Sequence, residues 1–432
     1  MRRFIAAVLL FLSAPTFLLG DTDSALLLDE LVERGVLTAE QASDALKLSA
    51  GFVESTSPAQ RIRLMQFWHM RYQEMTQTSN AATIEKGNFA LRRLVPVFMF
   101  DVSEKLHGMI TLLFPTNTVI NTVRLTYDVE SEYLCGSIWA GHECLSFCME
   151  EPESGMRIMT PDRSIMNMYF GGGDHGYYSG GVGYHRPAVA FSGYHTGLFW
   201  HGYLPENKSI IYRVSVVNSK PETIKFDGCN DVAFFWSFGI DHSEDANRYR
   251  LGVNFGYSGR VVNAVSGGFP SDVAAFGDCY GVNPYVWLSH ENFTLQSEFV
   301  LTRVQYGRTA SDSYSHYTVN SPTANPWAWY VLLGYKFGIN PYGELEPVVR
   351  YLHMNTDGRG VNENSVLYMA DSINGLYNKV DSFYAGVNWY VMGQSLKYQF
   401  GLEYAEFKDS PLGNKGKFSN VWLFIAQVQI IL

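Results

Sequence analysis

A regular alternation of apolar and polar residues is the feature that most constrains how this chain can fold. In residues 395–407, SLKYQFGLEYAEF, every second position from Leu396 to Tyr404 is apolar, and small or polar residues stand between them. A period of two predicts a β-strand, because successive side chains point to opposite faces of the pleat. A soluble sandwich would bury the apolar face in protein. A membrane barrel would turn the apolar face to lipid and the polar face to a watery lumen.

The same alternation recurs along the chain in long segments. Residues 61–73, 248–259 and 382–393 each show it over about twelve positions. Strands of soluble proteins are usually about five or six residues long, whereas a tilted strand that crosses a bilayer needs about ten. Aromatic residues also stand near the segment ends, as at Tyr72 and Tyr249, where membrane interfaces favour them. The pattern therefore favours the membrane barrel.

Sixteen segments qualify as strands, an even number, as in bacterial barrels of one chain. The last of them alternates through Trp422 and Phe424 to Leu432, which is expected of a strand that closes a barrel. The predicted strands are 61–73, 88–102, 105–114, 119–130, 133–142, 195–204, 209–218, 231–240, 247–258, 280–289, 292–306, 327–337, 342–354, 382–392, 395–407 and 420–432.

The composition agrees with an all-β membrane protein. Aromatic residues make up 15% of the 432 residues and glycines number 39. Charged residues make up 17%, below the roughly 25% of soluble domains. The formal net charge of −10 gives no indication of a nucleic-acid partner.

The N-terminal region differs from the rest. Residues 1–20 combine a basic start with an apolar stretch and predict a signal peptide. Residues 21–57 predict a periplasmic helical hairpin and linker, in which Thr38 and Gln41 form a capping box. The hairpin could bind a periplasmic partner or the cell wall, or pack as a plug or collar on the main domain. Residues 58–432 are the predicted barrel, placed in the bacterial outer membrane.

The five cysteines leave at least one thiol unpaired. Cys144 and Cys148 are close enough in sequence to form a disulfide, but their spacing does not establish one. Together with His142 they also form a weak metal-binding pattern, and the disulfide or free thiol is the better interpretation. The sequence predicts no metal site and no cofactor.

Several stretches together resemble the phosphate-selective porin O and P family of outer-membrane proteins. They are IRLMQFWHMRYQ, GNFALRRLVPVFMFDVSEKLHGMITLLF, GHECLSFCMEEPESGMRIMTPDRSIMN, GLFWHGYLPENKSIIYRVSVVNS and FYAGVNWYVMGQSLKYQFGLEYAEF. In the third stretch, residues that the family places in its long loop correspond to Gly141, His142, Arg163 and Ser164. The matches are short and scattered over residues 60–432, but they occur in the family's order.

The resemblance implies a homotrimeric barrel that lies in outer-membrane lipid, is inserted by the barrel-assembly machinery, and passes small hydrophilic solutes or anions by diffusion. It also implies a long loop, here about 142–186, that folds inward and limits solute size. Rings of arginine or lysine favour anions, and guanidinium groups suit phosphate oxygens. The predicted pore-lining or solute-binding residues are therefore Arg61, Arg63, Arg71, Arg163, Arg248, Arg250 and Lys397.

Motifs for other functions are weak. The glycine-rich stretch 170–184 lacks the spacing of a phosphate-binding loop. Asp174–His175 and Asp241–His242 could start acid–base chemistry, but no nucleophile motif accompanies them. We predict a porin and no enzyme activity. The alternatives are a barrel that acts as an adhesin, an anchor or a membrane-embedded hydrolase, and a secreted soluble β protein.

Overall fold

The computed structural model describes residues 61–114, 119–133, 135–171, 189, 192–219, 232–244, 247–259, 278–305, 322–367, 370 and 375–432, and the backbone of 52–54. The predicted signal peptide and most of the predicted helical hairpin and linker lie outside these residues. Within 21–57, the described part is the three-residue strand β1 (Phe52–Glu54), which pairs with the start of β2.

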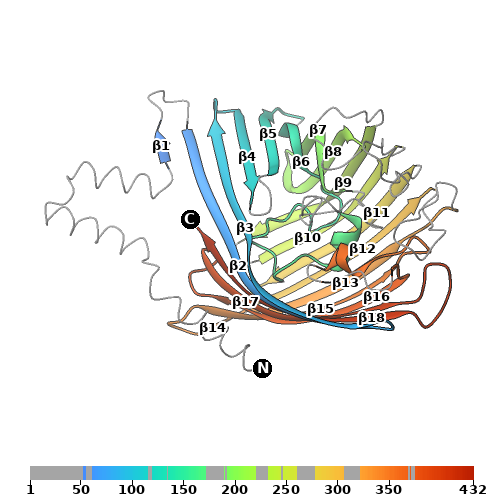
Figure 1. Cartoon of the computed structure of the whole chain (residues 1–432). Helices are drawn as coiled ribbons and strands as arrows, with labels where there is room; N and C mark the ends of the chain where they lie inside the picture. The colour runs from blue at the N-terminus through green and yellow to red at the C-terminus, as the bar shows by residue number, and fades with distance from the viewer. Residues whose placement is uncertain are drawn as a thin grey trace.

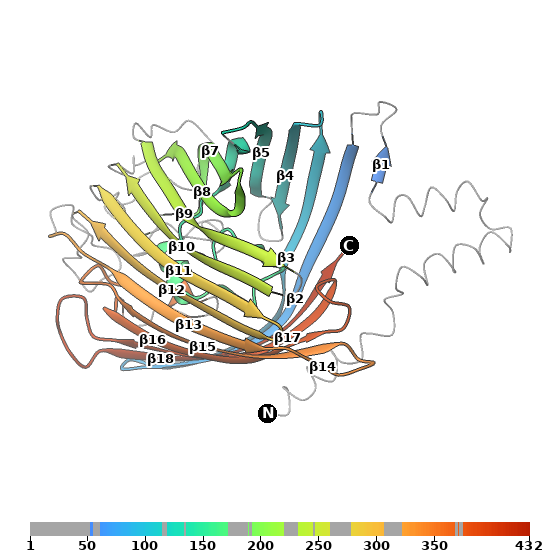
Figure 2. The ribbon, with the colours of Figure 1, turned by 180° about the vertical axis from the view of Figure 1, so that it is seen from behind.

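Sixteen antiparallel strands form one closed barrel, in which each strand pairs with its sequence neighbours and β18 pairs with β2 (Figures 1 and 2). Every predicted strand coincides with one of them, so the prediction of a sixteen-stranded antiparallel barrel is confirmed. A further two-residue strand, β14 (Phe337–Gly338), pairs with the start of β15. The barrel strands are β2 (Arg61–Ser79), β3 (Thr83–Asp101), β4 (Leu106–Leu113), β5 (Val119–Glu130), β6 (Cys135–Cys144), β7 (Tyr194–Leu204), β8 (Asn207–Asn218), β9 (Val232–Glu244), β10 (Asn247–Ser258), β11 (Cys279–His290), β12 (Phe293–Val304), β13 (Trp327–Tyr335), β15 (Glu344–Asn355), β16 (Lys379–Tyr390), β17 (Leu396–Lys408) and β18 (Phe418–Ile431).

The two ends of the barrel differ in their connections. At one end, short turns such as 102–105, 205–206 and 291–292 join the strands, and β2 begins and β18 ends there. We call this the short-turn end. At the other end the connections include 145–193, 259–278 and 305–326, and we call it the long-loop end.

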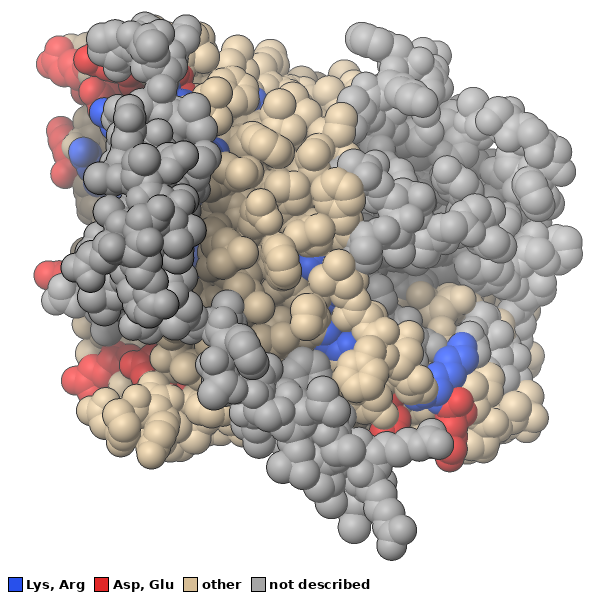
Figure 3. Space-filling view, turned by 60° about the vertical axis from the view of Figure 1, so that its left-hand side comes forward, with Lys and Arg blue, Asp and Glu red and all other residues tan. Residues whose placement is uncertain are grey.

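The two faces of the wall are reversed relative to a soluble protein. On β9, Phe234, Trp236 and Phe238 are exposed, while the side chains between them are buried. On β17 the buried inner side chains include Lys397 and Gln399. Figure 3 shows one side of the barrel, where uncharged residues cover most of the described surface and acidic residues lie toward its edges. An apolar outside around a polar inside is the arrangement of a barrel that lies in lipid.

A β-bulge in the β2–β3 pair changes which side chains enter the barrel. The register shifts between His69 and Met70, and both Arg92 and Arg93 are consequently buried. Strict alternation would have placed one of these two neighbours outside; the extra residue of a bulge removes that constraint. Pro96 lies close by, where the β3–β4 pairing is interrupted between Val97 and Leu94, so its missing N–H is tolerated.

The interior of the barrel is largely filled at the long-loop end. Two short helices, α4 (Ile165–Phe170) and α5 (Glu363–Val366), lie inside and contact each other (Figure 1). They pack with inward-facing apolar side chains of the wall, among them Leu352, Phe407 and Leu423. Within the described residues, no helix is long and apolar enough to span a membrane.

Candidate functional site

Residues 145–171, which we call the inward segment, leave β6 and cross the interior of the barrel (Figures 1 and 2). Most of their side chains are buried, and all six residues of α4 are. Arg163 fixes the fold of this segment, because its guanidinium donates to the carbonyl oxygens of Glu150 (2.9 Å), Glu151 (3.1 Å) and Glu153 (2.9 Å). Ser164 caps α4 by accepting from the backbone N–H of Asn167. Arg163 is therefore a structural residue of the segment.

The wall holds the inward segment through its backbone. Lys397 Nζ donates to the carbonyl oxygens of Met156 (2.8 Å) and Ile158 (3.4 Å). Asn388 Nδ2 donates to the carbonyl of Met159 at 2.9 Å. These bonds come from β16 and β17 and fix the part of the segment nearest the short-turn end.

Ion pairs hold the segment at a second set of points. Arg71 Nη1 lies 2.7 Å from Asp162 Oδ2, and Arg92 Nη2 lies 3.4 Å from Asp162 Oδ1. Burial acts to raise the pKa of Asp162, but Arg71 and Arg92 outweigh it and lower that pKa to about 2. Asp162 is thus a carboxylate clamped between two wall arginines.

Three further arginines of the wall, Arg248, Arg250 and Arg350, are paired in the same way. Arg250 Nη1 lies 2.7 Å from Glu153 Oε1, and Arg248 Nη2 lies 3.6 Å from the same oxygen. Arg350 pairs with Glu403 at 3.2 Å and with Glu150 at 3.7 Å. The carboxylates of the inward segment therefore neutralise most of the basic wall that they face.

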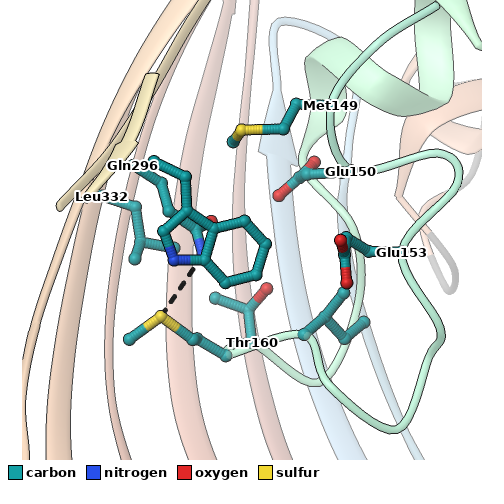
Figure 4. Close-up of a pocket in the computed structure, with 9 residues that line it drawn as sticks. Met149, Glu150, Glu153, Thr160, Gln296 and Leu332 are labelled. Atoms are coloured by element: carbon teal, nitrogen blue, oxygen red, sulfur yellow. Dashed lines mark hydrogen bonds between the residues drawn. The ribbon is translucent and has the colours of Figure 1, made fainter. Parts of the chain in front are cut away.

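Figure 4 shows how closely the inward segment approaches β11–β13. Glu150, Glu153 and Thr160 come from the segment, and Gln296 and Leu332 come from the wall. Gln296 Nε2 contacts the sulfur of Met159 at 3.6 Å. Only a small cavity separates the two, so this side of the barrel is nearly closed.

A second inward segment contains α5, between β15 and β16. Tyr169 donates its hydroxyl to the carbonyl oxygen of Gly360 at 3.1 Å, and Gln77 Nε2 donates to Glu363 at 3.1 Å. These bonds tie α5 to α4 and to β2. The sequence analysis did not predict this second segment.

The inner face of β5–β8 carries a different group of side chains, which we call the basic wall cluster: Arg124, Trp139, His201 and Arg213. The guanidinium of Arg124 lies 4.0 Å from the centre of the Trp139 ring, and His201 stacks on Trp139 at 3.7 Å. Arg124 pairs with Glu143 at 2.9 Å. Arg213 donates to the Ser146 hydroxyl at 2.9 Å, and within the described residues it has no ion pair.

Arg157 is the exposed cation of the inward segment. Its neighbour Met156 packs against inner side chains of β2–β4, whereas the Arg157 side chain is exposed and makes no ion pair with any residue that the structure describes. Arg157 and Arg213 are thus positive charges inside the barrel without a carboxylate partner among the described residues.

The predicted site residues separate into two groups. Arg61 and Arg63 are exposed at the short-turn end, where Arg63 lies 3.3 Å from Asp101. Arg71, Arg163, Arg248, Arg250 and Lys397 bind the inward segment or belong to it. The sequence analysis did not select Arg124, Arg157 or Arg213. Arg124 and Arg213 lie on the polar face of predicted strands, so the alternation could have found them, whereas Arg157 carries no comparable pattern.

The remaining motifs form no second site among the residues that the structure describes. Within the described residues, no disulfide joins Cys135, Cys144, Cys148 or Cys279 to another cysteine. Within the described residues, no group of three His, Cys, Asp or Glu side chains could hold a metal ion. Asp241 pairs with Arg250, while His242 contacts Ser209 at 3.0 Å, so this pair forms no joint acid–base site. Asp174 and His175 lie outside the described residues.

The family model described as phosphate-selective porin O and P matches residues 273–413. The resemblance is confirmed over this segment. No curated protein sequence matches the chain.

Three solved structures are similar over most of their length. The outer membrane channel DcaP of Acinetobacter baumannii has a TM-score of 0.51 at 12% identity, covering 88% of this chain and 99% of its own. The anion-selective porin from Comamonas acidovorans has a TM-score of 0.50 at 9% identity, with coverages of 86% and 100%. Pseudomonas putida OprB has a TM-score of 0.50 at 8% identity, with coverages of 90% and 96%. At such identities the similarity establishes a porin-like barrel and nothing more specific.

Proposed function

We propose that this protein is an outer-membrane channel through which small hydrophilic solutes diffuse passively, with a preference for anions. The family match and the porin-like barrel support the channel. The observation that carries the anion preference is the difference between paired and unpaired cations inside the barrel. Arg157 and Arg213 have no ion pair among the described residues, so no paired carboxylate there cancels their positive charge.

The proposed path runs between the inward segment and the inner face of β5–β7. The bonds that fix the segment go mainly to β2, β8, β10–β12 and β15–β18, where the cavity is small. The segment, with α5, limits solute size. Arg157 and Arg213 then select solutes by charge, because their fields are least screened for a solute that passes close to them.

Phosphate selectivity is a narrower proposal that this arrangement does not favour. Arg71, Arg248, Arg250, Arg163 and Lys397 bind carboxylates or carbonyl groups of the inward segment. An arginine that already binds a carboxylate has fewer donors left for phosphate oxygens. We therefore propose a general anion preference in place of a phosphate site built from these residues.

The cellular setting follows from the same proposal. Residues 1–20 would direct export, and residues 21–57 would remain in the periplasm beside the short-turn end. The barrel-assembly machinery would insert residues 58–432 into outer-membrane lipid, with the long-loop end outside the cell. A homotrimer is the proposed assembly, which size-exclusion chromatography with light scattering of the detergent-solubilised protein would measure.

The test is a planar bilayer experiment on purified, refolded protein under a KCl gradient. Discrete conductance steps with an anion-selective reversal potential are expected. Cation selectivity would contradict the anion preference, and block by phosphate much stronger than block by other anions would restore the phosphate site. An absence of steps from protein shown to be folded in the bilayer would contradict the channel.

A further inference from the structure

An apolar patch lies inside the barrel, where a diffusion channel is expected to be polar. Phe67, Val95 and Val97 form its buried part, on the inner face of β2 and β3. Partly buried side chains pack around them: Met65, Met99, Met109, Leu113, Met156 and Ile431. Four of these nine residues are methionines, whose flexible, polarisable side chains adapt to apolar ligands of different shapes.

The patch borders the basic wall cluster directly. In the register of the barrel, Met99 on β3 stands opposite Met109 on β4, and Met109 stands opposite Arg124 on β5. Side chains opposite each other on one face of neighbouring strands are close enough to act together. Arg124 Nη2 also lies 3.8 Å from the sulfur of Met109. An apolar surface and a guanidinium thus adjoin at one level of the lumen.

The basic wall cluster, which adjoins the apolar patch at Arg124, has more hydrogen-bond donors than acceptors. In the part of the chain that the structure describes, Arg124 has one carboxylate partner, Glu143. Within the described residues, the Nε–H of Arg124 and the Nε1–H of Trp139 are buried without a hydrogen-bond acceptor. His201 and Arg213 stand opposite each other on β7 and β8 and extend the same face. Buried donors without acceptors are uncommon, so an oxygen-bearing partner is expected near them.

We propose that Met99, Met109 and Arg124 form a lumen site for amphipathic monocarboxylates, solutes with one carboxylate on an apolar body. The carboxylate oxygens accept from Arg124, and the apolar body lies on the two methionines. This site rests on the proposed channel function and specifies a class of solute for it. A hydrated tetrahedral anion such as phosphate gains nothing from the methionine surface, which separates this site from a phosphate site.

The experiment measures how strongly added anions reduce the chloride current through single channels. Benzoate is the amphipathic probe, and acetate and inorganic phosphate are the comparison anions. Benzoate is expected to block the wild-type channel at concentrations about tenfold lower than acetate, since burial of a six-carbon body is favourable. The double variant Met99→Ser/Met109→Ser is expected to lose this advantage while it keeps its conductance steps in KCl.

Two further variants complete the experiment. Met392→Ser makes the same change at an exposed position in a short turn and is expected to leave benzoate block unchanged. Arg124→Gln is expected to weaken block by both benzoate and acetate. The proposal is overturned if acetate or phosphate blocks as strongly as benzoate, or if the double methionine variant keeps the wild-type block. Folded protein without any KCl steps contradicts the channel itself, which is a separate and recognisable result.

Discussion

Two parts of the barrel wall carry arginines on the polar face of a strand, and these arginines have different roles in the structure. On β2, β10 and β15, Arg71, Arg250 and Arg350 are buried and pair with carboxylates. On β8, Arg213 contacts a serine hydroxyl and has no ion pair within the described residues. Both kinds point inward from a strand. The comparison teaches that facing the lumen does not by itself make a cation available to a solute.

The difference follows from the path of the inward segment. Its carboxylates and carbonyl groups lie against one side of the barrel, and cations there are used to hold it. Buried charges are costly without partners, so these pairs form a connected set with little freedom to reorganise. Cations on the other side of the barrel are not used to hold the segment, so their charge can attract an anion that passes through the lumen.

The largest expected effect comes from breaking the Asp162 clamp. Asp162→Ala leaves Arg71 and Arg92 without this carboxylate, and breaking a buried pair from one side costs about 3–5 kcal/mol. The inward segment should detach locally, which raises single-channel conductance and current noise. Hydrogen exchange in residues 145–171 should increase in parallel.

Asp101→Ala is the matched control, because it removes a carboxylate from an exposed pair at the short-turn end. This variant should keep the wild-type conductance and exchange. If Asp162→Ala behaves like Asp101→Ala, the clamp does not hold the segment.

The same clamp predicts a pH dependence. The pKa of Asp162 in the folded protein is about 2, below the 3.8 that is ordinary for an aspartate carboxyl. The carboxylate of Asp162 therefore contributes its full stabilisation at pH values above the pKa that Asp162 has in the unfolded chain. This stabilisation is lost as the pH falls through the pKa of Asp162 in the folded protein. Conductance should stay constant down to about pH 4 and rise as the pH approaches 2. A rise that is complete between pH 5 and pH 4 would exclude Asp162 as its cause.

A smaller effect is expected from the contact at Lys397. Lys397→Met keeps the length of the side chain but leaves the carbonyl groups of Met156 and Ile158 without their donor. An unsatisfied buried acceptor costs about 1–3 kcal/mol, partly offset because the buried ammonium is also removed. Hydrogen exchange near residue 156 should rise less than in Asp162→Ala. If hydrogen exchange rose more in Lys397→Met than in Asp162→Ala, the contact at Lys397 would stabilise the inward segment more than the Asp162 clamp does, contrary to the proposed order.

The smallest effect is expected at the exposed end of β2. Arg63→Gln removes a pair with Asp101 in which the arginine side chain is 45% exposed, and such pairs contribute about 0–1 kcal/mol. Thermal unfolding followed by circular dichroism should match the wild type closely. A clear loss of stability would show that the pair of Arg63 with Asp101 contributes more to the stability of the barrel than its exposure indicates.

The alternation of residues predicted the wall well, because side-chain period and strand direction are local properties. All sixteen strands follow from it, including the segment that contains Pro96. The bulge that brings both Arg92 and Arg93 inside was not predictable from alternation, since it depends on an irregular register with β2. The alternation also placed Lys397 on the inner face correctly. That its partners would be Met156 and Ile158 depends on contacts between residues about 240 positions apart, which no local pattern encodes.

The most direct measurement compares reversal potentials of two double variants under the same KCl gradient. Arg157→Gln/Arg213→Gln removes two charges inside the barrel that have no ion pair among the described residues, and Arg61→Gln/Arg63→Gln removes two exposed charges from its short-turn end. The first should lower the chloride-to-potassium permeability ratio, because a unit charge about 5–8 Å from an ion in water changes the local concentration of chloride and of potassium about two- to fourfold each, in opposite directions. The second should leave the ratio close to that of the wild type. Equal changes in both variants, or a change in the second alone, would contradict the claim that the unpaired cations inside the barrel select the solute.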